Sequence, residues 1–358
     1  MNEQIWKGFL NMRLFLLLLL VALAGCQAVR LNPGEPESEE TGPSAFEINA
    51  RLGRGINLGN ALEAPREGEW GVTLRPEYFR LVREQGFNFV RVPIRWSAHA
   101  AKEPPYTIDE AFFERIDWVV EQALANDLAV ILNIHHYEEI MPDPQGHRER
   151  FLALWKQIAA RYQDAPDTVL FELLNEPFGD AMTAEVWNEL AQAGLEVVRE
   201  TNPRRFVVIG PVQWNNVERL DSLRLPETDR RILATFHFYE PFHFTHQGAE
   251  WVEGADAWLG ARWEGSEAQK AAVTNLLDKA RRWSEANDRP VLLGEFGAYS
   301  KADMESRARW TAFVAREAEA RGFSWAYWEF CSGFGIYNPA RRIFYTELVD
   351  ALIPKESQ

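Results

Sequence analysis

The chain has 358 residues, a net charge of −15 and a hydrophobic content of 46%. Binding to nucleic acid or to an anionic membrane surface requires a basic patch, so this charge argues against both kinds of partner. The length and the apolar content suffice for one large α/β domain or two smaller ones.

The first predicted element is an export signal. Residues 14–24 are apolar, follow Arg13, and lead into Leu23-Ala24-Gly25-Cys26. A helix of that length cannot cross a bilayer core of about 30 Å, but it fits the core of a signal peptide. The ending resembles a bacterial lipobox, so we expect residues 1–26 to be a lipoprotein signal peptide with Cys26 as the lipidated residue. Gln27 after the cysteine favours the outer membrane, on either its periplasmic or its cell-surface face.

Residues 27–46 form an acidic segment rich in Pro, Gly and Ser, which buries little and is predicted to be an extended linker. No comparable segment follows, so residues 47–358 are predicted to form one domain. If Cys26 carries lipid, Cys331 is the remaining cysteine and cannot form an internal disulfide.

Within this domain, short β-rich runs alternate with amphipathic helical runs. The predicted strands are residues 55–58, 87–94, 128–134, 169–174, 206–209, 232–238, 291–294 and 323–328. The predicted helices are residues 76–85, 110–126, 149–162, 184–201, 268–286 and 303–321.

This alternation predicts a parallel sheet covered by helices, and eight strands favour an α/β fold of the (β/α)8 TIM-barrel type. Runs such as AVILNI and VLFELL are apolar on both faces, as expected of strands buried inside a barrel. No glycine-rich phosphate-binding pattern follows the first strand, which lowers the chance of a nucleotide site.

Polar residues that are costly to bury recur at the C-terminal ends of these predicted strands, where the active sites of barrels are built. They are Arg91, His135, His136, Asn175, Glu176, His237, Tyr239, Glu295, Trp328 and Glu329. So many strand ends converging on one face are hard to explain by stability alone.

Two carboxylates of this set, Glu176 and Glu295, come from the predicted fourth and seventh strands. Glycoside hydrolysis uses such a pair, one to protonate the leaving oxygen and the other to attack the sugar or activate water. A gap of about 5–5.5 Å gives retention of anomeric configuration and about 6.5–9.5 Å gives inversion, but the sequence does not supply the gap. Fourteen Trp also suit a cleft in which sugar rings stack on indoles.

The chain resembles the family 5 glycoside hydrolases over residues 50–353. The resemblance is carried by motifs at successive strand ends: Gly53-Arg54-Gly55-Ile56-Asn57-Leu58-Gly59-Asn60, Arg91-Val92-Pro93, His135-His136, Leu174-Asn175-Glu176-Pro177, His237-Phe238-Tyr239, Gly294-Glu295-Phe296-Gly297 and Trp328. Three further segments, at residues 61–65, 247–251 and 330–334, resemble bacterial endo-β-1,4-glucanases, several of which also accept mannan. This implies a retaining endo-β-1,4-glucanase that is also able to act on mannan, glucomannan or mixed-linkage glucan.

The resemblance implies that Glu176 is the acid/base and Glu295 the nucleophile. Arg91 and Tyr239 are expected to keep Glu295 ionised, because a cation and a hydrogen-bond donor stabilise a carboxylate. Burial, or the second carboxylate, is expected to raise the pKa of Glu176.

The remaining expected site residues bind substrate. By resemblance, Asn175 binds the sugar 2-hydroxyl, His237 tunes the acid/base, His136 and His135 bind hydroxyls of the cleaved sugar, and Trp328 stacks beneath it. Both histidines can face one cleft only if the strand ends or twists there. Further hydroxyls are assigned to Asn60, Glu63 and Glu329, and Trp214, His246 and Trp251 are assigned to sugar subsites.

Three alternatives remain open at this point. The first is a dedicated β-1,4-mannanase, because glucan and mannan differ only in the configuration at C2. The second is a metal-dependent barrel hydrolase, although adjacent His135 and His136 diverge on a regular strand and are poorly spaced as ligands. The third is a non-catalytic sugar-binding lipoprotein. We expect no cofactor and no metal, and a monomer is the expected form.

Overall fold

The computed structural model of the chain describes residues 42–355. The expected signal peptide, Cys26 and residues 27–41 of the expected linker lie outside these residues. Within the part that is described, no helix is long and apolar enough to cross a membrane.

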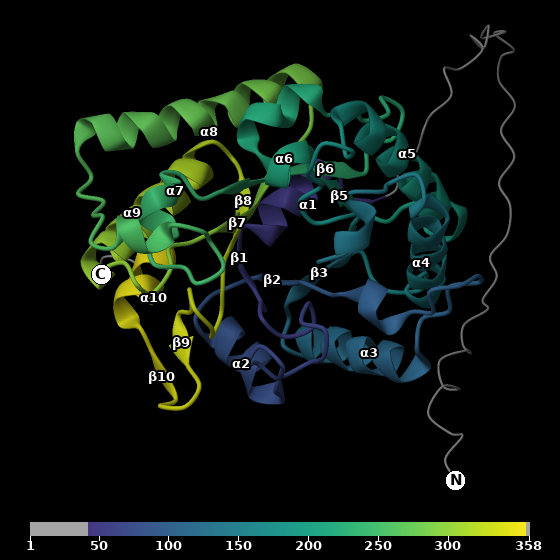
Figure 1. Cartoon of the computed structure of the whole chain (residues 1–358), viewed down its shortest axis with the longest axis horizontal. Helices are drawn as coiled ribbons and strands as arrows, with labels where there is room; N and C mark the ends of the chain where they lie inside the picture. The colour runs from purple at the N-terminus through teal and green to yellow at the C-terminus, as the bar shows by residue number, and fades with distance from the viewer. Residues whose placement is uncertain (1–41, 356–358) are drawn as a thin grey trace, which may run out of the picture. The chain divides into compact units, whose positions relative to one another are not determined.

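Eight parallel strands close into a barrel in the order β1 to β8, so each strand pairs with its sequence neighbours and β8 returns to β1 (Figure 1). The strands are β1 Arg54–Asn57, β2 Phe89–Val92, β3 Ala129–Asn133, β4 Val169–Glu172, β5 Val207–Ile209, β6 Ile232–Phe238, β7 Val291–Phe296 and β8 Ser324–Tyr327. A TIM barrel is therefore confirmed. The predicted runs locate all eight strands, with ends that differ by a few residues.

Helices surround this barrel in Figure 1. The long ones are α2 Pro76–Glu84, α3 Glu110–Ala125, α4 Arg148–Arg161, α5 Ala184–Thr201, α8 Glu267–Asn287 and α9 Met304–Ala320. The shorter helices are α1 Ala45–Leu52, α7 Phe242–Thr245 and α10 Thr346–Leu352. The short segment α6 Val212–Asn215 is a single turn whose last three residues have a left-handed backbone. Short 3₁₀ helices lie at η1 Trp96–His99, η2 Glu138–Ile140, η3 Val217–Ser222 and η4 Ala255–Trp258. A small hairpin pairs β9 Tyr337–Asn338 with β10 Ile343–Phe344.

Helix α1 closes the N-terminal end of the barrel. It begins after Ser44, whose side chain accepts a hydrogen bond from the Glu47 amide while the Glu47 carboxylate accepts one from the Ser44 amide. This capping box fixes the start of the helix. Its apolar face, which includes Ile48 and Leu52, packs with the inward side chains of the strands. Residues 45 and 46, expected in the linker, therefore belong to the folded domain.

The inward side chains of the barrel form two layers of different character. The layer next to α1 is apolar and consists of Phe89, Ile131, Leu170, Val208, Leu233, Leu292 and Ala326. The β1 residue at this layer is Gly55. A larger residue would not fit, because the Phe89 ring fills the space and an added Cβ would lie 2.3 Å from that ring. Two residues further toward the C-terminal mouth, the inward positions of five strands are polar, namely Asn57, Arg91, Asn133, Glu172 and Thr235. The barrel thus has a packed apolar floor beneath a polar mouth.

Candidate active site

A cleft of about 1480 Å³ lies at the polar mouth and extends outward to helix α8. Of the residues expected at the site, it is lined by Asn60, Glu63, His135, His136, Glu176, Trp214, His237, Tyr239, His246, Trp251, Glu295 and Trp328. Arg91 and Asn175 are buried beside the two central carboxylates. The structure therefore brings almost the whole predicted set together.

Glu295 faces the cleft because of a bulge in β7. Leu292 points into the barrel and Leu293 out of it, so regular alternation would point Glu295 toward the surrounding helices. The register with β6 shifts between Leu293 and Glu295, and Glu295 becomes the partner of inward-facing His237. The extra residue, Gly294, re-aims the carboxylate into the mouth, as β-bulges near active sites do.

The Glu295 carboxylate is held by a cation on one oxygen and a hydroxyl on the other. Arg91 Nη1 lies 2.7 Å from Oε1, and Tyr239 donates its hydroxyl to Oε2 at 2.9 Å. Burial raises the pKa of Glu295, while His237, Arg91 and the Tyr239 hydrogen bond oppose that rise. Both partners expected from the sequence are in contact with the carboxylate.

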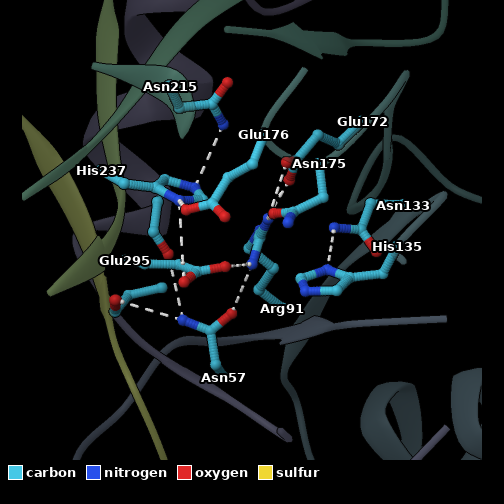
Figure 2. Close-up of polar contacts among 12 residues, drawn as sticks. Asn57, Arg91, Asn133, His135, Glu172, Asn175, Glu176, Asn215, His237 and Glu295 are labelled. Atoms are coloured by element: carbon cyan, nitrogen blue, oxygen red, sulfur yellow. Dashed lines mark hydrogen bonds and ion pairs between the residues drawn. The ribbon is translucent and has the colours of Figure 1, made fainter. Parts of the chain in front are cut away.

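Arg91 is itself fully buried and ties four side chains together (Figure 2). Its Nε and Nη2 donate to the two oxygens of Glu172, each at 2.7 Å. Nη1 also donates to Asn57 Oδ1 and Nη2 to Asn175 Oδ1, each at 2.8 Å. Glu172 lies within the run VLFELL, which we took as apolar on both faces, and that interpretation was wrong at this position. The Glu172 carboxylate is a second counter-ion for the buried Arg91 guanidinium, beside Glu295.

Glu176 lies in a different electrostatic environment. Its backbone is left-handed, with φ of 47°, and its Oε1 is 2.7 Å from Nδ1 of His237. A quarter of its side chain remains exposed to the cleft. Desolvation by the surrounding wall raises the pKa of Glu176 to about 7, with Arg91 as the largest opposing influence. Among residues 42–355, no arginine hydrogen-bonds to this carboxyl group, in contrast to Glu295.

Glu176, His237 and Glu295 each place one ligating atom within 4.8 Å of the other two. Among residues 42–355 they are the only group of His, Cys, Asp and Glu side chains clustered closely enough to hold a metal ion. A metal cation there would lie beside the Arg91 guanidinium, 2.7 Å from the same Glu295 carboxylate, and would be repelled by it. The donor set therefore fits a metal poorly.

Comparison with known proteins identifies the family. Residues 54–333 match the family model "Cellulase (glycosyl hydrolase family 5)". The chain belongs to glycosyl hydrolase family 5.

Several relatives of this family 5 chain are characterised. Endoglucanase H and the cellulase/esterase CelE of Acetivibrio thermocellus are 36% and 33% identical over 88% and 87% of the chain. The chain spans 34% and 40% of the length of these two relatives. Crystal structures of Cel5A from Thermotoga maritima, one with cellobiose and one with mannotriose, are 52% identical, have a TM-score of 0.85, and cover 86% of this chain and 100% of theirs.

The two adjacent histidines of the family 5 site both reach the cleft because β3 has ended. The last strand residue is Asn133, and His136 has a left-handed backbone with φ of 48°. Asn133 Oδ1 accepts a hydrogen bond from the Ile94 amide, so its Nδ2 is the atom that faces Nδ1 of His135 at 3.1 Å. His135 therefore carries its proton on Nε2. Its ring stacks on that of Trp328, with centroids 5.9 Å apart.

Glu63 and Glu329 have different roles in the wall. The Glu63 carboxylate accepts hydrogen bonds from the amides of Asn60 and Ala61, and Glu63 also lines the cleft. The Glu329 carboxylate accepts from the amides of three residues that follow it, and it is fully buried. Burial raises the pKa of each to about 7. Glu329, expected to bind a hydroxyl, does not line the cleft, because its oxygens are committed to the loop of residues 331–334.

Aromatic side chains stand at both ends of the cleft. Trp214 and Trp251, expected at sugar subsites, are 54% and 59% exposed. His246 is buried under a stacked Phe242 ring with centroids 4.1 Å apart, so only its edge borders the cleft. Trp70 was not assigned to the site from the sequence, although it lines the cleft. Its ring meets that of His136 edge to face, with centroids 5.4 Å apart. Its place in the long loop after β1 was the available signal.

Proposed function

We propose that this protein is a retaining endo-β-1,4-glucanase. The observation that carries the proposal is the pairing of Glu176 and Glu295, whose facing oxygens lie within 4.8 Å. Retaining glycosidases hold their carboxyl groups about 5–5.5 Å apart, whereas an inverting enzyme leaves room for water between them. The unequal environments of the two glutamates support one acid and one nucleophile.

In the first step, Glu176 gives its proton to the glycosidic oxygen as the bond from that oxygen to C1 breaks. A Glu295 oxygen forms the new bond to C1, which produces a covalent glycosyl-enzyme. Arg91 and the Tyr239 hydroxyl hold Glu295 in place and favour its charged form before attack. Asn175, whose Oδ1 is fixed by Arg91, is positioned beside the acid to bind the 2-hydroxyl.

In the second step, the ionised Glu176 removes a proton from a water molecule that attacks C1 from the vacated side. The bond between C1 and Glu295 breaks, the sugar leaves with its configuration retained, and Glu176 is protonated again. The Nδ1 atom of His237 lies 2.7 Å from the Glu176 carboxyl group that accepts and donates these protons. Side chains of the chain supply every proton in this scheme apart from those of water.

The shape of the cleft supports attack within a polymer. Its walls continue on both sides of the two carboxylates, from Asn60 and Trp70 to Trp214 and Gln269. A polysaccharide can therefore lie across the carboxylates with sugars bound on either side. Mannan or glucomannan is the second candidate substrate, because the similar Thermotoga maritima enzyme has been crystallised with mannotriose as well as cellobiose.

The test is to incubate the full chain with carboxymethylcellulose, glucomannan and β-1,4-mannan, and to measure viscosity and reducing ends together. Endo cleavage lowers viscosity early, at a low yield of reducing ends. Glu295→Gln should reduce turnover below a few per cent while oligosaccharide binding is kept. A 2-fluoro cellobioside should label Glu295 covalently, as detected by peptide mass spectrometry. Inactivity on all three polymers, or labelling at another residue, would contradict the proposal.

A further inference from the structure

The segment after β5 has an unusual backbone. Gln213, Trp214 and Asn215 are three consecutive non-glycine residues in the left-handed region, with φ of 60°, 59° and 53°. Left-handed backbone is unfavourable for each of them, and such strain is retained where the surrounding structure enforces it, often at functional sites. This left-handed turn is in contact with the loop that carries the acid/base.

Two contacts join the turn to that loop. The Trp214 ring stacks on Phe178, with centroids 5.0 Å apart and planes 14° from parallel, and the Trp214 amide donates to the carbonyl of Pro177 at 3.4 Å. Phe178 and Pro177 directly follow Glu176. The turn therefore exposes Trp214 to the cleft and directs its neighbour Asn215 inward.

Asn215 is completely buried, and its Nδ2 lies 3.2 Å from Nε2 of His237 (Figure 2). The amide occupies the space above Gly210, where an added Cβ would lie 2.3 Å from Oδ1. Oδ1 has no hydrogen-bond partner within the described part of the chain. Within the described residues, the contact with His237 is thus the one hydrogen bond of this buried side chain. Glycine at residue 210 provides the space that the Asn215 amide occupies.

The contact determines where the imidazole carries its proton. Nδ1 of His237 faces Glu176 Oε1 at 2.7 Å, and it is 3.6 Å from Glu295 Oε2. Burial lowers the pKa of His237 to about 4, so the ring is neutral and holds one proton. If Nε2 accepts a hydrogen from Asn215, that proton must be on Nδ1. The orientation of the Asn215 amide therefore determines the tautomer of His237: Nδ2 toward the ring places the proton on Nδ1, and Oδ1 toward the ring places it on Nε2.

The two tautomers have opposite consequences for an acid catalyst. With the proton on Nδ1, His237 donates to one oxygen of Glu176 and leaves the acid proton on the other oxygen for the leaving group. With the proton on Nε2, Nδ1 is a bare acceptor, and the short contact would draw the proton of Glu176 toward the ring. Only the first tautomer leaves the acid proton available to the substrate.

We propose that Asn215 is a positioning residue that donates Nδ2–H to His237 and so prevents the ring from capturing the proton of Glu176. This inference rests on the proposed acid/base role of Glu176. Asn215 is buried and does not line the cleft, so it acts through His237.

The experiment compares Asn215→Asp, which replaces the donor by an acceptor of the same shape, with Asn215→Leu, which removes the donor without adding charge. We measure kcat/KM for cellotetraose and for 2,4-dinitrophenyl β-cellobioside, because this parameter reports the first irreversible step. For cellotetraose, whose leaving group needs a proton, Asn215→Asp should lose about 10²-fold or more, the range of general acid catalysis. For 2,4-dinitrophenyl β-cellobioside, whose leaving group needs none, both variants should lose severalfold at most. Asn215→Leu should fall between wild type and Asn215→Asp on cellotetraose.

Asn188→Asp is the matched control. Asn188 is on α5, outside the cleft, where its Nδ2 donates to the Ser222 carbonyl. Asn188→Asp makes the same chemical change away from the cleft, so any change in kcat/KM should be the same for both substrates. Equal losses on both substrates for the two Asn215 variants would overturn the proposal and leave a packing role.

A second measurement does not depend on whether the Asn215 variants fold. The ¹⁵N spectrum of the wild-type histidine rings, with His237 assigned by the signal lost in His237→Gln, should show a protonated Nδ1 and a bare Nε2. A protonated Nε2 would overturn the inference even if the enzyme cleaves β-glycan. If the wild-type enzyme is inactive on all three polymers, it is the proposed function that fails.

Discussion

The two carboxyl groups of the cleft differ in what faces them, and this difference separates their tasks. Glu295 meets a guanidinium and a phenol, whereas Glu176 meets a neutral imidazole. Glu172 contributes indirectly, because its bidentate pair with Arg91 fixes the guanidinium plane. The same side chain can thus act as an acid or a nucleophile according to its partners.

This arrangement predicts the pH dependence of kcat/KM. The acid must be protonated in the free enzyme, and the pKa of Glu176 is about 7. As pH rises through about 7, Glu176 loses its proton and the rate should fall. As pH falls, Glu295 takes up a proton and the rate should fall again, which gives a bell-shaped profile.

The basic limb can be assigned with Glu176→Ala and 2,4-dinitrophenyl β-cellobioside. This variant should retain cleavage in the first step, because the substrate needs no acid, and it should lack the fall in rate above pH 7. Azide should accelerate its turnover. A basic limb unchanged in Glu176→Ala would assign that ionisation to another group.

Residue types at strand ends made most of the site predictable, whereas contacts between distant residues were not. Glu176 and Glu295 follow apolar runs, and their chemistry is evident from the residue type. Glu172 was missed because a buried glutamate inside an apolar run looks like an interruption unless its cation is known. Asn215 was missed because nothing in its neighbourhood in the sequence indicates that His237 lies 3.2 Å away. Glu329 lies behind the wall of the cleft, because its oxygens accept hydrogen bonds from backbone amides whose positions the sequence does not reveal.

At the scale of elements, β7 shows how one irregularity determines which group reaches the cleft. Gly294 is the extra residue of the bulge, and an added Cβ would lie 2.7 Å from Thr235 Oγ1 and 3.1 Å from His237 Nε2. Asn57 donates to the Gly294 carbonyl at 3.0 Å and holds the bulge in place. The bulge was not predictable, because a period of two residues cannot show where a strand skips a position.

Gly294→Ala should therefore lower kcat sharply with little effect on the fold. The methyl group must displace Thr235, His237 or β7 itself, and a shift of the nucleophile by about 1 Å can cost about 10²-fold in rate. Steady-state kinetics on carboxymethylcellulose and a thermal unfolding curve measure the two effects separately.

Gly322→Ala is the control for this substitution. Gly322 has a left-handed backbone with φ of 74°, follows α9, and has open space where its Cβ would be. The Gly322→Ala variant should lose stability from backbone strain, while its kcat stays close to that of the wild type. A Gly294→Ala enzyme with wild-type kcat would show that the bulge tolerates a side chain and that the close contacts do not matter.

At the scale of the whole described domain, the barrel was predictable because its physics is local and repeated. Each parallel strand is buried on both faces and each helix on one, which produces the alternation of apolar runs and amphipathic stretches. Helix α1 was not predicted, because its eight residues follow an acidic segment and carry one narrow apolar face. Its position under the barrel depends on the apolar floor made by seven of the eight strands, which no local pattern can reveal.

Beyond the domain, the expected lipid anchor at Cys26 remains a proposal, because that residue lies outside the described part of the chain. The chain has two cysteines. Cys331 is buried behind the cleft, and burial raises the pKa of its thiol, which makes it a poor nucleophile. Acylation of the chain should therefore depend on Cys26 alone.

Expression of the full chain in a Gram-negative host with labelled palmitate should give a labelled protein that partitions into detergent on phase separation. Cys26→Ser should abolish the label and move the protein to the aqueous phase, with kcat on soluble substrate unchanged, because residues 43–358 form a compact unit of their own. Cys331→Ala, the matched control, should keep the label. If Cys26→Ser is still labelled, or if the wild type stays in the aqueous phase, the anchor is wrong and the leader is an ordinary signal peptide at most.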